Sequence, residues 1–120
     1  MVATHRTHEY LGRKVVERLD HNVNSTLTRD VQDLVFELVV DHIEYSKNSK
    51  SMLSDRDPLR ETIHYYVSEV CVPERADFYK VVADERNNPQ NTQAGTFVID
   101  IEFQAKGSLI ATKLRYTISH

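Results

Sequence analysis

Residues 28–45 show the most regular pattern of apolar positions in the chain. Thr28 is a favoured first residue of a helix, and Asp30 falls in the first turn, where a negative charge interacts favourably with the helix end. Apolar side chains then recur at spacings of i, i+3, i+4, i+7 and i+8, at Val31, Leu34, Val35, Leu38 and Val39. The pattern predicts an amphipathic helix that runs from Thr28 to about Tyr45.

A second apolar stripe lies nearer the N-terminus, in residues 7–22. One apolar side chain recurs per helical turn at Leu11, Val15 and Leu19, and Val16 widens the stripe. Gly12 is a tolerated weak position in such a pattern. The spacing therefore predicts a second amphipathic helix, which the turn-forming residues 22–25 end.

Residues 58–72 give two competing signals. Pro58 suits the first position of a helix, and the apolar residues after it are helically spaced at Leu59, Ile63, Tyr66 and Val70. Residues 65–67 and 70–72 are nevertheless rich in strand formers. We expect a helix that ends before Pro73, preceded by a flexible polar loop at 46–57.

The last third of the chain changes to the alternation of strands. A short apolar strand is predicted at Phe78–Ala83, and a half-buried strand at Thr96–Ala105. The inward residues of the second strand are Phe97, Ile99, Ile101 and Phe103. The last strand places Ile110, Leu114, Tyr116 and Ile118 inward, with Lys113, Arg115 and Thr117 outward.

This order of helices first and strands last indicates an α+β domain, with two to three helices followed by a small, mainly antiparallel sheet. The 120 residues suit one domain over residues 1–120, and 40% apolar and 28% charged residues lie within the globular range. The net charge of −3, without a basic stripe, argues against nucleic-acid binding. No apolar run approaches the ~20 residues of a membrane helix, so we expect no membrane partner.

Candidate chemistry in the chain is sparse. His5 and His8 would share one helical face, but a metal ion needs further ligands that the pattern does not supply. Asp84 and Glu85 are adjacent carboxylates beside a cation and several amides, which favours hydrogen bonds within a loop over acid–base catalysis. Cys71 has no neighbour in sequence that would lower its pKa, so it is read as a small buried hydrophobe.

The remaining histidines and tyrosines support the same interpretation. His42 and His64 fall on predicted helices and suit packing or surface positions. Tyr65, Tyr66 and Tyr79 could form an adhesive aromatic patch, and core packing explains them about equally well. No nucleophile, base and oxyanion set converges in the sequence, so we expect no enzyme, with no catalytic residue, no cofactor and no metal.

Residues 78–89 (FYKVVADERNNP) resemble the C-terminal domain of contractile tail sheath proteins, found in myophages and related contractile injection systems. That family has a strand that ends in a CDxxNN/T pattern, a polar loop, an alternating VDI strand and a final strand. The matching residues here are Ala83–Asn88, Val98–Ile101 and Ala111–Thr117. The resemblance covers about the last forty residues, and the helices upstream, at Arg13–Leu19 and Val31–Ile43, match in pattern only.

The resemblance implies an assembly function rather than chemistry. Sheath domains extend arms that add strands to the sheets of neighbouring subunits. Here it implies arms at residues 1–8 and 109–120, with hinges at Gly107 and at Ala94-Gly95, and a sheet completed by exchanged strands. The segment expected to exchange is Leu109, Ile110, Ala111, Thr112, Lys113, Leu114, Arg115, Tyr116, Thr117 and Ile118. The motif loop is Asp84, Glu85, Arg86, Asn87, Asn88 and Pro89.

The partners implied are copies of the chain in six-fold rings or a helix, a tail tube protein, and baseplate or neck proteins. The location implied is the virion tail, assembled in the cytoplasm of the bacterial host. Glu37, Asp41 and Glu44 could meet basic residues of the tube, although the solvated face of an amphipathic helix explains these acids about equally well.

Departures from the family keep alternatives open. Complete sheath proteins are several times longer, and Gln104-Ala105-Lys106 stands where the family often carries a proline. The first alternative is a sheath initiator of the baseplate or a tail terminator, either of which shares the fold and stays monomeric or forms a closed ring. A distant alternative is a small α+β enzyme that uses Asp84, Glu85 or His64.

Overall fold

A computed structural model describes residues 5–20, 26–45, 56–89 and 96–119. In chain order the elements are β1 (His5–Tyr10), β2 (Arg13–Asp20), α1 (Thr26–Tyr45), α2 (Arg56–Val70), β3 (Ala76–Val82), β4 (Phe97–Ala105) and β5 (Thr112–Ser119). They form the expected α+β fold. The loop predicted at 46–57, the hinge at Ala94-Gly95 and the first residues of the N-terminal arm lie largely outside the described residues.

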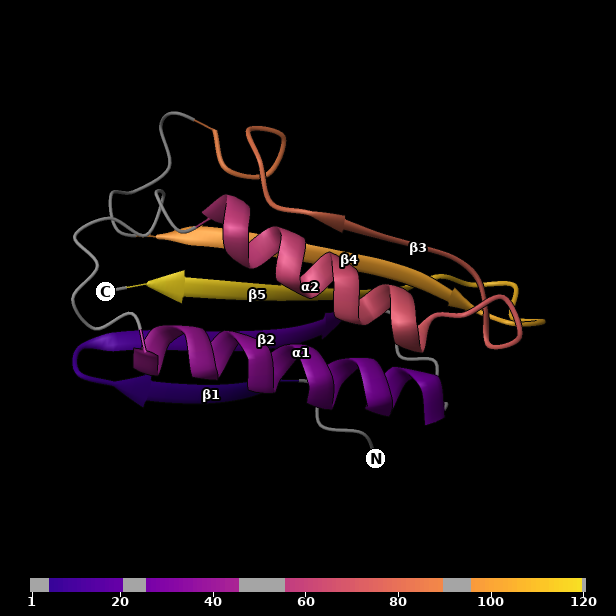
Figure 1. Cartoon of the computed structure of the whole chain (residues 1–120), viewed down its shortest axis with the longest axis horizontal. Helices are drawn as coiled ribbons and strands as arrows, with labels where there is room; N and C mark the ends of the chain where they lie inside the picture. The colour runs from indigo at the N-terminus through magenta and orange to yellow at the C-terminus, as the bar shows by residue number, and fades with distance from the viewer. Residues whose placement is uncertain (1–4, 21–25, 46–55, 90–95, 120) are drawn as a thin grey trace.

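The five strands form one antiparallel sheet in the order β1-β2-β5-β4-β3. The last strand of the chain, β5, is therefore the central one, and β1 and β3 are the edges. Both helices lie on the same face of the sheet, with α1 over the β1–β2 side and α2 over the β4–β3 side (Figure 1). Neither described helix is long and apolar enough to cross a membrane.

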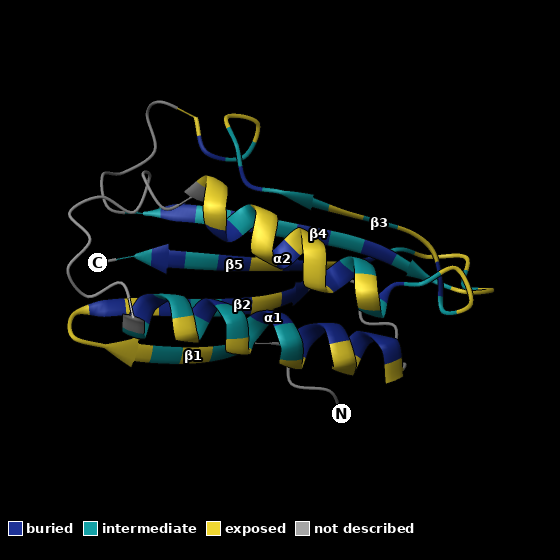
Figure 2. Cartoon of the chain, in the orientation of Figure 1, coloured by how far each residue is buried: buried dark blue, intermediate teal, exposed yellow. Residues whose placement is uncertain are grey.

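The core fills the layer between the helices and the sheet. Strand β4 alternates as predicted, because Phe97, Ile99, Ile101 and Phe103 are at most 1% exposed while the residues between them are half-buried. On the helix side, Val35 and Ile63 are fully buried. Figure 2 shows the exposed residues of both helices on the face turned away from the sheet. Burial of such side chains stabilises a fold by about 1.5–3 kcal/mol each, so this single layer is the main source of stability.

The helix predicted over residues 7–22 is wrong, because the structure has a hairpin there. Strands β1 and β2 pair in antiparallel register and are joined by Leu11 and Gly12, both with positive φ. Leu11, Val15 and Leu19 are spaced by four residues, which fits one turn of a helix and also two full periods of a strand. Residues 13–20 form a strand and not a helix because β2 pairs with β5, and this pairing buries Val15 and Leu19. Helices therefore do not come first in the chain.

Smaller boundaries also differ from the prediction. The α2 helix begins at Arg56, two residues before the predicted start at Pro58, and ends at Val70, before Pro73 as predicted. Its apolar residues Leu59, Ile63 and Val67 share the buried face. Strand β5 begins at Thr112, so Ile110, predicted to face inward, is 58% exposed and precedes the strand.

The hairpin predicts a contrast between two adjacent valines. Val15 faces the core and is fully buried, whereas Val16 lies on the opposite, half-buried face. Val15→Ala should lower the free energy of unfolding by about 2 kcal/mol and Val16→Ala by less than about 1 kcal/mol. Urea denaturation measures both changes. Equal losses would contradict the strand assignment, because only a helical stripe places both residues on one buried face.

Candidate functional site

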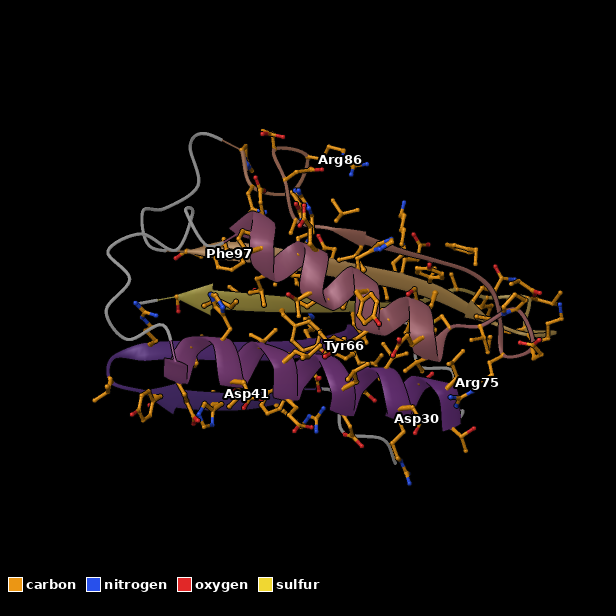
Figure 3. All side chains as sticks on the ribbon, in the orientation of Figure 1. Asp30, Asp41, Tyr66, Arg75, Arg86 and Phe97 are labelled. Carbon is orange, nitrogen blue, oxygen red and sulfur yellow. The ribbon has the colours of Figure 1, made fainter. Side chains whose placement is uncertain are left out.

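The motif loop is a compact turn that ends β3. The backbone amide of Asn88 donates a hydrogen bond to the carbonyl of Asp84 at 2.9 Å. The Asp84 carboxylate accepts a hydrogen bond from the backbone amide of Arg86 at 2.9 Å. The Arg86 guanidinium also binds this carboxylate, with Nη2 at 2.8 Å from Oδ2. Figure 3 shows Arg86 on this loop, beyond the end of β3. Oδ1 of Asn87 accepts from the backbone amide of Asp84 at 3.1 Å, and Nδ2 of Asn88 donates to the carbonyl of Asp84 at 3.3 Å. The acidic and amide side chains of the loop therefore bind its own backbone, as predicted.

The charge state of Asp84 follows from that contact. Hydrogen bonds from the side chain and the backbone of Arg86 lower the pKa of Asp84 to about 2. A carboxylate with so low a pKa stays ionised at neutral pH and is a poor proton donor. His64 and Glu85, the other two residues considered for catalysis, are both exposed, and His64 lies against the ring of Tyr79, with centroids 5.6 Å apart. Neither the contact of Asp84 with Arg86 nor that of His64 with Tyr79 pairs a proton donor with a proton acceptor for catalysis.

Asn88 takes the place of a missing strand residue. The ladder between β3 and β4 ends where Val82 pairs with Asp100, so Val98 has no β3 residue opposite it. The amide of Val98 donates to Oδ1 of Asn88 at 2.6 Å, and the Val98 carbonyl accepts from Nδ2 of Asn88 at 2.9 Å. The asparagine side chain thus satisfies both backbone groups of Val98, as a paired strand would.

Asn87 connects the same loop to the open face of the sheet. Its Nδ2 donates to the carbonyl of Val82 at 2.8 Å and to Oδ2 of Asp100 at 2.9 Å. Asp100 also accepts from Arg115 on the neighbouring strand, with Nε at 2.7 Å from Oδ1. The loop, β4 and β5, which carry the resemblance to sheath domains, therefore form one hydrogen-bonded unit.

The segment expected to exchange, 109–118, occupies two environments. Thr112–Ile118 lies in β5, paired with β2 on one side and β4 on the other within the same chain. Leu109 and Ile110 precede the strand and are 97% and 58% exposed. In the single chain this segment is therefore the centre of the sheet and not an extended arm, and its exchange between subunits stays a prediction.

The acidic residues expected to meet a tube lie along α1. Glu37 and Asp41 are exposed, and Asp41 is labelled in Figure 3. Glu44 is half-buried, and its Oε1 accepts a hydrogen bond from Nε2 of His8 at 3.1 Å. Two of the three acids are thus available to a partner, and the third ties α1 to β1.

A cluster that sequence reasoning missed lies on β2. Glu17 is 1% exposed, and both of its oxygens are bound by the Arg6 guanidinium, at 2.8 Å from Nε and 3.0 Å from Nη2. The hydroxyl of Tyr116 donates to Glu17 at 2.6 Å, and Nε2 of Gln32 lies 3.4 Å away. Arg6 also donates to the Asp33 carboxylate at 3.0 Å. We call these five residues the Glu17 cluster.

The Glu17 cluster joins β1, β2, α1 and β5. Burial, followed by the negative charge of Glu17, raises the pKa of the Tyr116 hydroxyl well above its usual value. The hydrogen bond to Glu17 raises the pKa of Arg6, which stays charged. The guanidinium also lies over the ring of Phe36, 4.4 Å from its centroid. The signal in the sequence is a glutamate at an inward position between Val15 and Leu19, and it is visible only once residues 13–20 are read as a strand.

The other candidates take ordinary structural positions. Cys71 is buried, which raises the pKa of its thiol to about 11 and confirms its reading as a packed residue. Tyr65 and Tyr66 are 58% and 40% exposed and meet edge to face, whereas Tyr79 is half-buried against the core. Within the described part of the chain, no three histidine, cysteine, aspartate or glutamate residues gather where a metal ion could be held.

Asn88→Ala should destabilise the protein by about 2–3 kcal/mol, because the amide of Val98 would lose the bond to Asn88 and its carbonyl would keep only the longer bond from Nδ2 of Asn87, at 3.2 Å. Urea denaturation measures the loss. Arg86→Ala is the matched control in the same loop, because Arg86 is exposed and its removal should cost only a small fraction of that amount. Equal losses in the two variants would contradict the role given to Asn88.

Asp84→Asn should remove a part of the stability that depends on pH. The folded pKa of Asp84, about 2, lies below the unfolded value of about 3.9, so its stabilisation is present above about pH 5 and is lost as the pH falls through about 2. The difference in free energy of unfolding between the natural protein and the variant should therefore shrink on acidification. Urea denaturation at successive pH values measures it, and a constant difference would show that Asp84 does not titrate in this way.

Comparison of the chain with protein-family models, with curated proteins and with solved structures finds no match. A function for the chain therefore rests on its own contacts, in the motif loop and the Glu17 cluster, and on the motif at residues 78–89.

Proposed function

We propose that this chain is a structural subunit of a contractile tail, a sheath-like domain that surrounds the tail tube and joins neighbouring subunits through strands of its sheet. The observation that carries the proposal is an open sheet with both edge strands uncovered. Among the described residues, nothing pairs with the outer edge of β1 or of β3. Exposed edges template the addition of a further strand, and proteins that stay monomeric usually protect them.

The β3 edge suits strand addition. Asp77, Phe78 and Lys80 are exposed along β3, and within the described ranges the strand pairs only with β4. Beside it, residues of α2 and β3 line a shallow depression that includes His64, Ser68 and Tyr79. An added strand would find backbone partners along the edge and side-chain contacts in the depression.

The centre of the sheet is a less accessible place for exchange. To give β5 to a neighbour, the chain would have to break its ladders with both β2 and β4 and expose Leu114, Tyr116 and Ile118, all of which are at most 1% exposed. The geometry therefore favours association at the edges, with the exposed Leu109 and Ile110 as apolar contacts for a neighbouring subunit.

One observation favours the second candidate, a sheath initiator of the baseplate or a tail terminator. The chain supplies all five strands of its own sheet, so the fold needs no strand from a neighbour. A subunit of this kind would bind the end of a tube or form a single closed ring instead of a helical polymer.

Electron microscopy of the purified chain over a series of concentrations, with and without a tail tube protein, tests the proposal. Helical tubes or stacked six-fold rings around the tube are the expected result for a sheath subunit. A chain that is found only at tube ends would support the initiator or terminator. Absence of both assembly and tube binding would overturn the proposed function.

A pair of charge-reversed variants tests the surface that meets the tube. Glu37→Lys with Asp41→Lys should weaken tube binding about tenfold or more, because two exposed acids of α1 would become cations. Glu61→Lys with Glu69→Lys is the matched control, since it changes the charge equally at exposed sites on α2. Co-sedimentation with the tube measures both. Unchanged binding by the α1 variant would remove these acids from the interface.

A further inference from the structure

We propose that a concavity between the motif loop and the open face of the sheet binds the phosphate group of a small soluble ligand. The open face is the side of the sheet opposite both helices (Figure 1). Such a site is independent of the proposed assembly, because it needs neither a tail tube nor a second copy of the chain.

The concavity is the size of a small-ligand site and has an excess of positive charge. Its volume is about 500 Å³, and the residues around it come from β3, the motif loop, β4 and β5. Its charged side chains are four cations and two carboxylates, namely Lys80, Arg86, Lys113, Arg115, Asp100 and Glu102. The concavity therefore has two positive charges in excess, although the whole chain has a net charge of −3.

Lys113 is the cation of this group that lacks a carboxylate partner. It is exposed on β5, and among the described residues no ion pair joins its ammonium group to a carboxylate. Glu102 lies opposite Lys113 in the β4–β5 register, but its Oε1 pairs with Nζ of Lys80, at 3.4 Å. The ammonium group of Lys113 is therefore available to an anion in the concavity.

Arg115 is held in position beside Lys113 by a chain of hydrogen bonds from the motif loop. Nε and Nη2 of Arg115 donate to the two oxygens of Asp100, at 2.7 and 3.1 Å. Oδ2 of Asp100 also accepts from Nδ2 of Asn87, at 2.9 Å. A guanidinium group has five N–H donors, so one that binds a carboxylate can also donate to a phosphate oxygen. The loop thus orients a donor group before any ligand arrives.

The remaining two cations are held only by exposed ion pairs. Arg86 pairs with Asp84 and Lys80 pairs with Glu102, and the side chains of these cations are 71% and 58% exposed. Exposed pairs of this kind contribute little to stability. A phosphate group can therefore attract both cations without a large loss elsewhere in the fold.

The pairing of β2 with β5 gives a second reason for an anion at this place. Arg18 of β2 lies directly opposite Arg115 of β5, and both are exposed on the open face. Like charges directly opposite one another destabilise a pair of strands. Asp100 offsets the charge of Arg115 from the β4 side. A bound dianion would reduce the repulsion further.

The charge and the donor groups favour phosphate over other anions. A phosphate monoester carries about −1.5 to −2 charges at pH 7, which matches the excess in the concavity, whereas a carboxylate carries one. Guanidinium and ammonium groups are the usual partners of phosphate oxygens. A long polyanion fits less well, because the carboxylates of Glu9, Asp100 and Glu102 lie on the same face.

Isothermal titration calorimetry with inorganic phosphate tests the site, with acetate at the same ionic strength as the monoanion comparison. Lys113→Gln should weaken phosphate binding about tenfold, because it removes the ammonium group that no described carboxylate binds. Lys14→Gln is the matched control, since Lys14 is exposed on the same face but lies six residues along the sheet, opposite Ser119. That separation of about 20 Å exceeds the Debye length, so binding should change by less than about twofold.

Three outcomes of this titration would overturn the proposal. They are the absence of phosphate binding by the natural protein, equal affinities for phosphate and acetate, and equal losses in Lys113→Gln and Lys14→Gln. Thermal unfolding without phosphate checks that both variants fold. Lys113→Gln should keep the natural midpoint, because it breaks no ion pair among the described residues.

A substitution that should strengthen binding tests the sign of the effect. Glu102→Gln removes a carboxylate from the concavity and releases Lys80, so phosphate affinity should rise about fivefold. Glu9→Gln is its control, because Glu9 is exposed on the same face and pairs with the distant Lys14, at 4.0 Å. Unchanged or weaker phosphate binding by Glu102→Gln would contradict a phosphate site in this concavity.

A comparison of probes identifies the source of the phosphate group. Binding of phenyl phosphate, without co-sedimentation of the protein with vesicles that contain phosphatidic acid, would support a small soluble ligand. Preference for those vesicles or for a single-stranded oligonucleotide, with equal losses in Lys113→Gln and Lys14→Gln, would show a general anion-binding surface. That result would overturn the assignment to the concavity.

Discussion

The buried carboxylate of Glu17 is the constraint on which one half of the structure depends. It lies on β2, and its partners come from β1, α1 and β5, at Arg6, Gln32 and Tyr116. Removing one partner of a buried ion pair commonly costs about 3–5 kcal/mol, because the remaining charge is left without compensation. Four elements are therefore fixed relative to one another by one group, and β1, which adds nothing to the apolar core, keeps its place chiefly through this charge and its ladder to β2.

The β3–β4 half of the sheet is completed by a side chain of the motif loop. At the end of β3 the chain turns away, and Asn88 supplies a side-chain amide to the backbone of Val98. The motif loop thus ends the β3–β4 ladder without leaving buried backbone groups unpaired. Edge strand β1 is positioned by the charge of Glu17, and edge strand β3 by the motif loop. Different substitutions should therefore destabilise the two edges.

The sequence predicted those elements whose apolar spacing fits only one period. Helix α1 follows the i, i+3, i+4 pattern and β4 alternates over nine residues, so both elements were identified. Helix α1 begins at Thr26 instead of Thr28, and Asp30 therefore lies beyond its first turn. Residues 7–22 were not, because a spacing of four residues satisfies a helix and a strand alike. That error hid Glu17, since a glutamate next to a helical stripe reads as solvated, whereas at an inward strand position it must be buried.

The candidate site was predictable in its local parts and not in its long-range ones. Hydrogen bonding within the Asp84–Asn88 loop follows from residue types that bind nearby backbone, and the structure has it. The position of β5 depends on pairing with β2, almost a hundred residues earlier in the chain, as the contact between Tyr116 and Glu17 illustrates. Local patterns carry no information about such a partner, because they give the face of a strand and not its neighbours.

The central position of β5 also determines how copies of this chain can associate. A central strand is held by two ladders and by its core side chains, whereas an edge strand is held by one ladder. Among the described residues, β1 and β3 each pair with a neighbour on one side only, whereas β2, β5 and β4 pair on both. An association that uses an edge would leave β2, β5 and β4 paired as they are, because it would break neither their ladders nor the layer of core side chains beneath the helices.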